Sequence, residues 1–178
     1  MPVNTTDTVV IKDIEHWKDY VRAPDLSHLA AADWEPQIAQ MEAVDRSEQF
    51  AMVSIAPGIF EQCHHLSEIK THLLNHYTNP EAVHELIEYL TEWELQLAEQ
   101  YCTYLHPEGV FHHDDWGTQL STFMSNDMFD EFYLPAYEQV YGYYKSHGAE
   151  LIVHHSDSYA ATLVPEMINM GVDIWQGV

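Results

Sequence analysis

Two short runs of the sequence combine residue types that bind metal ions and exchange protons. They are residues 112–115 (His-His-Asp-Asp) and 154–157 (His-His-Ser-Asp), and each follows an apolar stretch. Imidazole and carboxylate groups bind zinc at about 2.0–2.2 Å, and the same pairs can act as a general base and the group that orients it. Alternatively, these histidines only hydrogen-bond neighbouring loops at the ends of strands.

Strand geometry selects partners within each run. Side chains at positions i and i+2 of a strand point to the same side of the sheet. His155 is therefore expected to converge with Asp157, and we expect these two residues to bind the metal if one is present. The candidates for acid–base or metal-binding residues are His113, Asp115, His155 and Asp157.

A third run, residues 63–65 (Cys-His-His), also contains ligand types and is predicted to begin a helix. Adjacent residues diverge on a helix, so this run is less suited to a site. Its cysteine and Cys102 are far apart and lack CxxC spacing. We expect both to be buried free thiols in a reducing compartment.

Short strands separated by helices are expected to position these runs. Strands are predicted to begin near Ala51, Val110, Glu150 and Asp173. Strands that alternate with helices pair in parallel, and ligands bind at the carboxyl ends of parallel strands. The sequence therefore predicts an α/β fold of the parallel (β/α) TIM-barrel type, with the polar runs on one face.

Local patterns predict the remaining elements. Asn79-Pro80 should open a long helix, Ser67 and Ser125 should cap two others, and Pro135 should kink or divide the helix that contains it. Residues 9–11 form a short β-like run, and helices are predicted over 14–21, 34–44 and 160–170. The predicted organisation is an N-terminal segment with short helices, 1–44, and a barrel portion, 45–178, within a single domain.

The chain has 178 residues, whereas an eight-stranded barrel usually needs roughly 250. We therefore expect an incomplete barrel with about four strands, belonging to a larger one. Half a barrel exposes two sheet edges and its interior. Such a chain is expected to form a homodimer or to pair with a complementary barrel fragment.

The charge balance excludes some partners. A formal net charge of −23, from 29 acidic and 6 basic residues, argues against nucleic acid and anionic membrane surfaces, which bind clustered Lys and Arg. The apolar runs are too short to span a bilayer, and the N-terminus does not resemble a signal peptide. The expected location is the cytoplasm.

Several motifs resemble those of the uroporphyrinogen decarboxylase superfamily. Residues 114–119 (DDWGTQ), 124–129 (MSNDMF) and 134–137 (LPAY) are similar to its DDxGTQ, SPEMF and PY motifs. Other similar segments are the turn at 56–61, HGA at 147–149, HSD at 155–157 and GVDI at 171–174. The resemblance covers roughly residues 8–178 and fits the cobalamin-dependent methyltransferase branch better than the decarboxylases proper.

The resemblance implies a (β/α)8 barrel that transfers a methyl group between a methylated or methoxylated small molecule and a corrinoid supplied by a partner protein. Zinc in that branch is held by a His-x-Cys pair and a later Cys; His155 matches the His, and Asp157 stands where the Cys would be. Together with the strand ends, the motifs indicate a substrate pocket formed by Asp114, Trp116, Gln119, Gly58 and Gln176.

Two alternatives remain at this point. One is a lyase like uroporphyrinogen decarboxylase, acting in porphyrin biosynthesis. The carboxylates of Asp114, Asp115 and Asp157 would repel its acidic tetrapyrrole substrate, which favours the methyltransferase. The other is a catalytically inactive half-barrel that serves as a binding domain.

Overall fold

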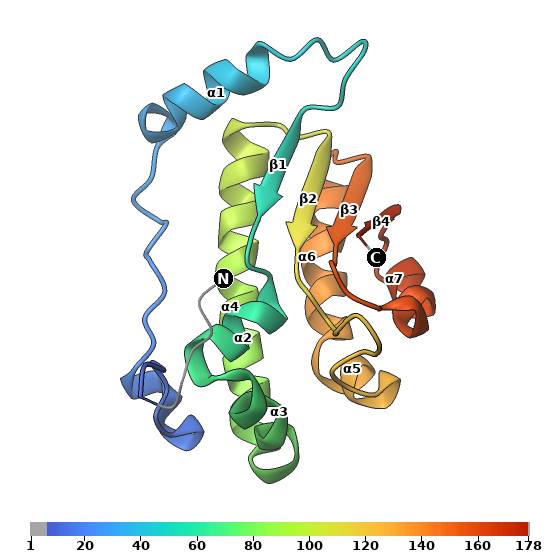
Figure 1. Ribbon diagram of the computed structural model, residues 1–178. Helices are drawn as coiled ribbons and strands as arrows, with labels where there is room; N and C mark the ends of the chain where they lie inside the picture. Colours follow the sequence, from blue (N-terminus) through green and yellow to red (C-terminus); the bar gives the residue numbers. More distant parts are fainter. Residues whose placement is uncertain (1–6, 178) are drawn as a thin grey trace.

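A computed structural model describes residues 7–177 and contains one four-stranded sheet with the order β1-β2-β3-β4. All neighbouring strands are parallel, and their arrows point the same way in Figure 1. The strands are β1 (Met52–Ile55), β2 (Gly109–His113), β3 (Leu151–His155) and β4 (Ile174–Gln176). The predicted parallel α/β architecture with four strands is therefore confirmed.

Helices link consecutive strands and leave one face of the sheet bare. β1 leads to β2 through α2 (Ile59–Ser67), α3 (Ile69–Thr78) and α4 (Pro80–Tyr104). The later crossovers contain α5 (Asn126–Phe132), α6 (Leu134–Ser146), the 3-10 helix η3 (Ala161–Leu163) and α7 (Val164–Asn169). In Figure 1, α4 and α6 lie behind the sheet, and no helix covers the side facing the viewer.

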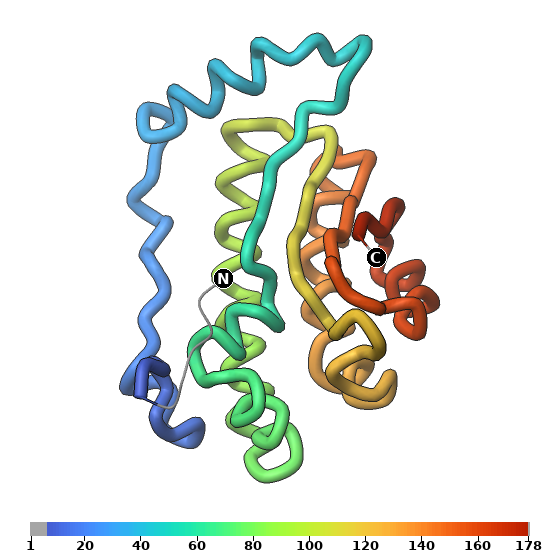
Figure 2. Tube along the Cα trace, viewed as in Figure 1, coloured from blue at the N-terminus to red at the C-terminus, as the bar shows by residue number. Residues whose placement is uncertain are grey.

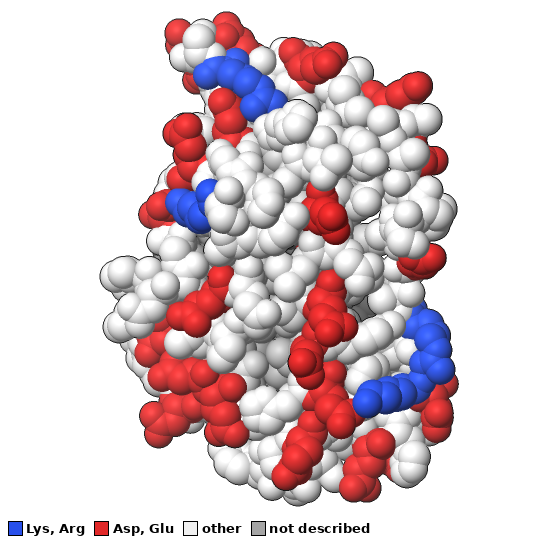
Figure 3. Space-filling view, turned by 180° about the vertical axis from the view of Figure 1, so that it is seen from behind, with Lys and Arg blue, Asp and Glu red and all other residues white. Residues whose placement is uncertain are grey.

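The long helix α4 shows how its pattern produces its packing. Its apolar residues face inward, and the side chains of Val83, Leu86, Ile87 and Leu90 are buried. The glutamates on its outer side are exposed, namely Glu81, Glu85, Glu88, Glu92 and Glu99. Seen from behind, acidic residues form several separate patches and outnumber the basic residues (Figure 3). Glu94 is the exception on this helix, because it is fully buried.

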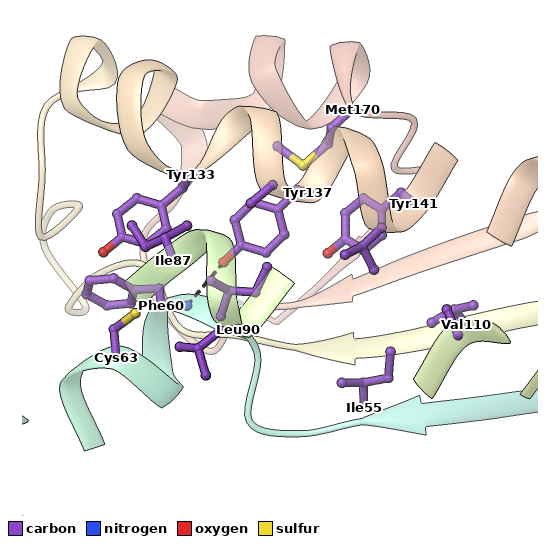
Figure 4. Close-up of a cluster of buried hydrophobic side chains, with 14 of the residues drawn as sticks. Ile55, Phe60, Cys63, Ile87, Leu90, Val110, Tyr133, Tyr137, Tyr141 and Met170 are labelled. Carbon is purple, nitrogen blue, oxygen red and sulfur yellow. Dashed lines mark hydrogen bonds between the residues drawn. The ribbon is translucent and has the colours of Figure 1, made fainter. Parts of the chain in front are cut away.

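Aromatic side chains of α6 and of Tyr133, the residue before it, fill the space between this helix and the rest of the core. Tyr133, Tyr137 and Tyr141 recur every four residues and project from one side of the helix (Figure 4). All three are fully buried. Ser125 caps α5 by accepting a hydrogen bond from the Met128 amide, and the chain divides at Tyr133, before Pro135, as predicted.

The N-terminal segment runs beside α4 and carries the 3-10 helices η1 (Ile14–Asp19) and η2 (Ala31–Trp34), then α1 (Glu35–Glu42). Figure 2 shows it as the blue stretch that leads to the beginning of β1. The β-like run at 9–11 does not form a strand; the amides of Val10 and Ile11 instead donate to the Leu66 carbonyl. Residues 1–6 and Val178, which belong to the predicted domain ranges, lie outside the described part.

Two other local predictions had different outcomes. Ser67 does not cap α3, because it belongs to the last turn of α2; Glu68 caps α3 by accepting from the amides of Lys70 and Thr71. Cys63 and Cys102 are free and buried, as predicted.

Between residues 7 and 177, no helix is both long and apolar enough to cross a membrane.

Candidate functional site

Strand alternation separates the two histidines of each run onto opposite faces of the sheet. His112 and His154 are register partners, and both are fully buried on the face covered by α4 and α6. His113 and His155 are the next register partners, and strand alternation places them on the opposite face, on which Figure 1 shows no helix. Their ring centroids are 4.5 Å apart.

The open-face histidines meet a carboxylate. One potential ligand atom each from His113, Asp115 and His155 lies within 4.8 Å of the others, and we call these residues the strand-end cluster. His113 Nε2 is 3.7 Å from Asp115 Oδ1. His155 Nδ1 donates a hydrogen bond to Gln176 Oε1, which orients the ring.

Asp157 does not join this cluster through its side chain. The side chain is exposed, and its backbone amide donates to Asp115 Oδ1 over 2.6 Å. The physical reason is that β3 ends at His155, so the i and i+2 rule of a strand no longer applies two residues later. The carboxylate that meets His155 therefore comes from the neighbouring chain segment, Asp115, and not from the same one.

A second group of potential ligands lies on α2. Glu61, His64 and His65 are spaced i, i+3 and i+4, which places them on one side of a helix. One potential ligand atom of each lies within 4.8 Å of the other two, and we call these residues the helix cluster. No site was predicted here from the sequence, because only the adjacent residues 63–65 were compared. The helical spacing of Glu61 and His64, three residues apart, is the pattern that indicates this group.

The two clusters meet at one contact. Glu61 Oε2 is 3.6 Å from His113 Nε2. Both atoms are buried and have no hydrogen-bond partner among the described residues. Buried polar atoms are nearly always satisfied in folded proteins, so this contact marks a place where a further group would complete the structure.

The Glu61 carboxyl and the His64 imidazole of the helix cluster are both uncharged at neutral pH when no cation is bound. Burial raises the pKa of Glu61 to about 8, and the negative charges of Asp114 and Asp115 add to the rise. Burial, with His65 nearby, lowers the pKa of His64 to about 4. At neutral pH the carboxyl therefore keeps its proton and the imidazole stays neutral. A bound cation would displace that proton.

Asp114 and Gly58 hold α2 in place. The Asp114 carboxylate accepts hydrogen bonds from the amides of Phe60 and Glu61, each over 2.9 Å, and from the Tyr137 hydroxyl. Gly58 passes so close that an added Cβ would lie 2.6 Å from Asp114 Cβ. Asp114 is fully buried. These two predicted substrate-binding residues therefore position the first turn of α2 against β2.

The other predicted pocket residues are dispersed. Trp116 is fully buried, stacks on His154 at 3.8 Å between ring centroids, and donates to the Tyr137 hydroxyl. Gln119 is exposed in a loop closed by a bridge between Gly117 and Thr122. Gln176 reaches the strand-end cluster through His155.

The buried histidines belong to a separate network. The Nδ1 atoms of His112 and His154 lie 2.6 and 3.1 Å from the Tyr141 hydroxyl. His112 Nε2 is 3.6 Å from Glu94 Oε2, and the other Glu94 oxygen accepts from Gln62. Burial lowers the pKa of His112, but the Glu94 charge outweighs it and the net shift is upward. Burial and the neighbouring His112 lower the pKa of His154 well below its ordinary value.

A cavity of about 250 Å³ lies between the N-terminal segment, α2 and α4. Its walls are mostly apolar, and His65 of the helix cluster forms part of them. The lining residues are Val21, Arg22, Ala23, Pro24, Pro57, Gln62, His65, Leu66, Leu90 and Trp93. A small molecule with an apolar group could therefore occupy space beside the helix cluster.

The strand-end cluster fits a zinc-like cation by its donor set. Two imidazoles and one carboxylate match the three protein ligands of catalytic zinc sites, which keep another position open. His113 Nε2 is buried without a hydrogen-bond partner in the described structure, and the His155 ring is held by Gln176. No thiolate is part of the group. Nitrogen and oxygen ligands also suit manganese, iron and cobalt ions.

Comparison with known proteins gives one result at the level of the family. The family model of uroporphyrinogen decarboxylase (URO-D) matches residues 15–176. No curated protein and no solved structure matches the chain significantly. The matched range contains all four strands and both clusters.

Proposed function

Since the chain belongs to the uroporphyrinogen decarboxylase family, we propose that it takes part in methyl transfer between a methylated or methoxylated small molecule and a corrinoid protein, with a cation bound at its strand-end cluster. The observation that carries this proposal is the convergence of His113, Asp115 and His155 at the carboxyl ends of β2 and β3. Sites at this end of parallel strands are typical of barrel enzymes.

His113, Asp115 and His155 would hold the cation, and Gln176 would keep the His155 ring in its binding orientation. The Asp157 amide would restrain the Asp115 carboxylate in the same way. A bound zinc-like cation polarises the oxygen, sulfur or nitrogen atom that carries the methyl group. The methyl group would pass to the reduced cobalt of the corrinoid, and the atom that carried it would keep the bonding electron pair.

The apolar cavity beside His65 supports a small substrate with a methyl or methoxy group. Pro57, Leu90 and Trp93 provide apolar walls, and pockets for small molecules combine such walls with a few polar groups. Trp93 donates its indole N–H to the Pro24 carbonyl, which fixes one wall to the N-terminal segment. The cavity beside the helix cluster therefore supports a small substrate with an apolar group.

The test measures cation binding and methyl transfer on the same preparations. Metal-free wild-type protein is titrated with Zn²⁺ by calorimetry, beside His155→Ala and an exposed control, His28→Ala. The zinc-loaded proteins are then mixed with reduced cobalamin and a panel of methylated thiols, amines and methoxylated aromatics, and methylcobalamin is followed by absorbance.

We expect His155→Ala to lose zinc binding at the strand-end cluster and methyl transfer, and His28→Ala to resemble the wild type. Zinc binding that is indifferent to His155→Ala would refute the assignment of this site. Zinc binding without methyl transfer from any donor of the panel, together with turnover of uroporphyrinogen, would replace the methyltransferase proposal with a decarboxylase.

The open edges of the sheet support a partner that completes the barrel. In the described structure, β1 pairs only with β2 and β4 only with β3. We include in the proposal either a homodimer or a complementary barrel fragment, because unpaired edges and a bare sheet face favour association. Sizing chromatography with light scattering tests the homodimer: a monomer at micromolar concentration would exclude it.

A further inference from the structure

We infer that the helix cluster is a second cation site, so that Glu61, His64 and His65 bind a divalent ion next to the one at the strand-end cluster. This inference rests on the proposed function in one respect: it assumes that the strand-end cluster binds the first cation. It assigns ligands on α2, a helix that contributes none of the residues of the first site.

The spacing of the helix cluster suits a metal ion. A Glu-x-x-His pair on one helix projects both side chains to the same side and is a recurrent ligand pair in two-metal carboxylate proteins. Here His65 adds a second imidazole at i+4, and its ring centroid is 4.5 Å from that of His64. Nitrogen and oxygen donors of this kind suit Mn²⁺, Fe²⁺, Co²⁺ and Zn²⁺.

The helix cluster is also rigidly placed. Asp114 accepts the amide hydrogens of Phe60 and Glu61, so the first turn of α2 is tied to the segment that follows β2. The Gly58 amide donates to the His113 carbonyl over 2.7 Å. A ligand set supported by such hydrogen bonds needs little rearrangement to bind an ion.

An independent observation points to a missing ligand between the clusters. Glu61 is only 4% exposed, and its Oε2 atom has no hydrogen-bond partner in the described structure. This oxygen faces His113 Nε2, 3.6 Å away, which also has none. One ion near each atom would satisfy both, with Glu61 lying between the two ions. Two-metal sites hold their ions about 3.5–4 Å apart.

In such a centre each of the two ions would contact a different atom involved in the reaction. In two-metal sites the ions together stabilise the attacking and the leaving atoms. The cavity wall formed by His65 places the second ion beside the space proposed for the methyl donor. An ion at the strand-end cluster would lie at the ends of β2 and β3. A bound heteroatom could therefore contact both ions.

The experiment counts ions and tests their proximity with Mn²⁺ as the probe. The 178-residue protein is freed of metal, dialysed against Mn²⁺ and analysed by elemental analysis and electron paramagnetic resonance. The variants are Glu61→Gln and His64→Ala in the helix cluster, His155→Ala in the strand-end cluster, and His28→Ala as an exposed control. Circular dichroism confirms that each variant is folded, and Glu61→Gln keeps the shape of its side chain if His64→Ala fails to fold.

We expect two Mn²⁺ per wild-type chain with a spin-coupled spectrum, and one uncoupled ion in Glu61→Gln, His64→Ala and His155→Ala. One ion in the wild type that only His155→Ala removes would overturn the second site and leave the proposed function standing. One ion that only the Glu61 and His64 variants remove would overturn the first site instead. Binding that no variant changes would overturn both.

Discussion

The two pairs of histidines on β2 and β3 have the same sequence context but opposite surroundings. His112 and His154 face the helices and are fully buried, whereas His113 and His155, one residue later, lie on the bare face. The buried pair shares the Tyr141 hydroxyl, and His112 faces Glu94. The open pair faces Asp115 and Glu61 instead.

The difference teaches that residue type alone does not define a site in a strand. The buried pair has most of its polar atoms paired within the protein, which is the usual state of a structural histidine. Each pair retains one atom without a hydrogen-bond partner in the described structure, His112 Nε2 and His113 Nε2. Only the open pair forms a group of two imidazoles and a carboxylate whose ligand atoms converge. A shift of one residue along the strand thus separates a structural network from a candidate cation site.

The largest expected effect is on stability, and it separates the pairs directly. His112→Ala removes one partner of the buried contact with Glu94 and leaves that carboxylate uncompensated. We expect a loss of about 3–5 kcal/mol in the free energy of unfolding, measured by urea denaturation. His113→Ala, on the open face, should change the free energy by less than about 1 kcal/mol in metal-free protein. Equal losses in the two variants would show that both pairs hold the fold together.

Cation affinity should show the reverse order. His113→Ala removes a direct ligand, and we expect its Zn²⁺ affinity to fall by at least about 100-fold, since even outer-shell changes cost 10–100-fold. Tyr141→Phe keeps the ring of the buried network and removes only its hydroxyl. Its affinity should stay within about threefold of the wild type by calorimetry. A large loss in Tyr141→Phe would mean that the two pairs are energetically coupled.

The buried pair should also make stability sensitive to acid. Burial holds the pKa of His154 well below 6.5, its value when unfolded. Below pH 6.5 the unfolded chain binds a proton that the native state excludes, so this contribution to stability is present above 6.5 and is lost as the pH falls. The shift of His112 is upward, so its contribution has the opposite sign: it is present below pH 6.5 and lost as the pH rises.

The variant His154→Gln lacks the imidazole that binds a proton in the unfolded wild-type chain below pH 6.5. Urea denaturation of metal-free protein between pH 7 and 5 should therefore show a smaller loss of stability in this variant than in the wild type. An equal or steeper loss would mean that His154 does not sense the pH in this way.

The smallest effect concerns the support of the open pair. Gln176 accepts a hydrogen bond from His155 Nδ1 and is itself exposed. Gln176→Ala should lower Zn²⁺ affinity by about 10-fold, the lower end of outer-shell effects, with no measurable change in stability. Gln119→Ala is the matched control, because Gln119 is an exposed glutamine in a distant part of the sequence. Identical affinities for both variants would show that Gln176 does not orient the ring.

Much of the architecture followed from local patterns. The start of α4 at Asn79-Pro80, the Ser125 cap and the break before Pro135 depend on neighbours a few residues away, and each was predicted. The N-terminal run at 9–11 failed as a strand because no strand lies beside it; its amides bond to α2 instead. Local preference cannot reveal whether a β-like segment has a partner to pair with.

The candidate site was predicted only in outline. The sequence by itself determined that His113, Asp115 and His155 would lie at the carboxyl ends of parallel strands, because strands that alternate with helices pair in parallel. Only the tertiary structure decided that Asp115 and not Asp157 meets His155, and that Glu61 and His64 on α2 approach the same place. Those contacts depend on where a strand ends and how a helix is docked, and residue spacing carries no information on either.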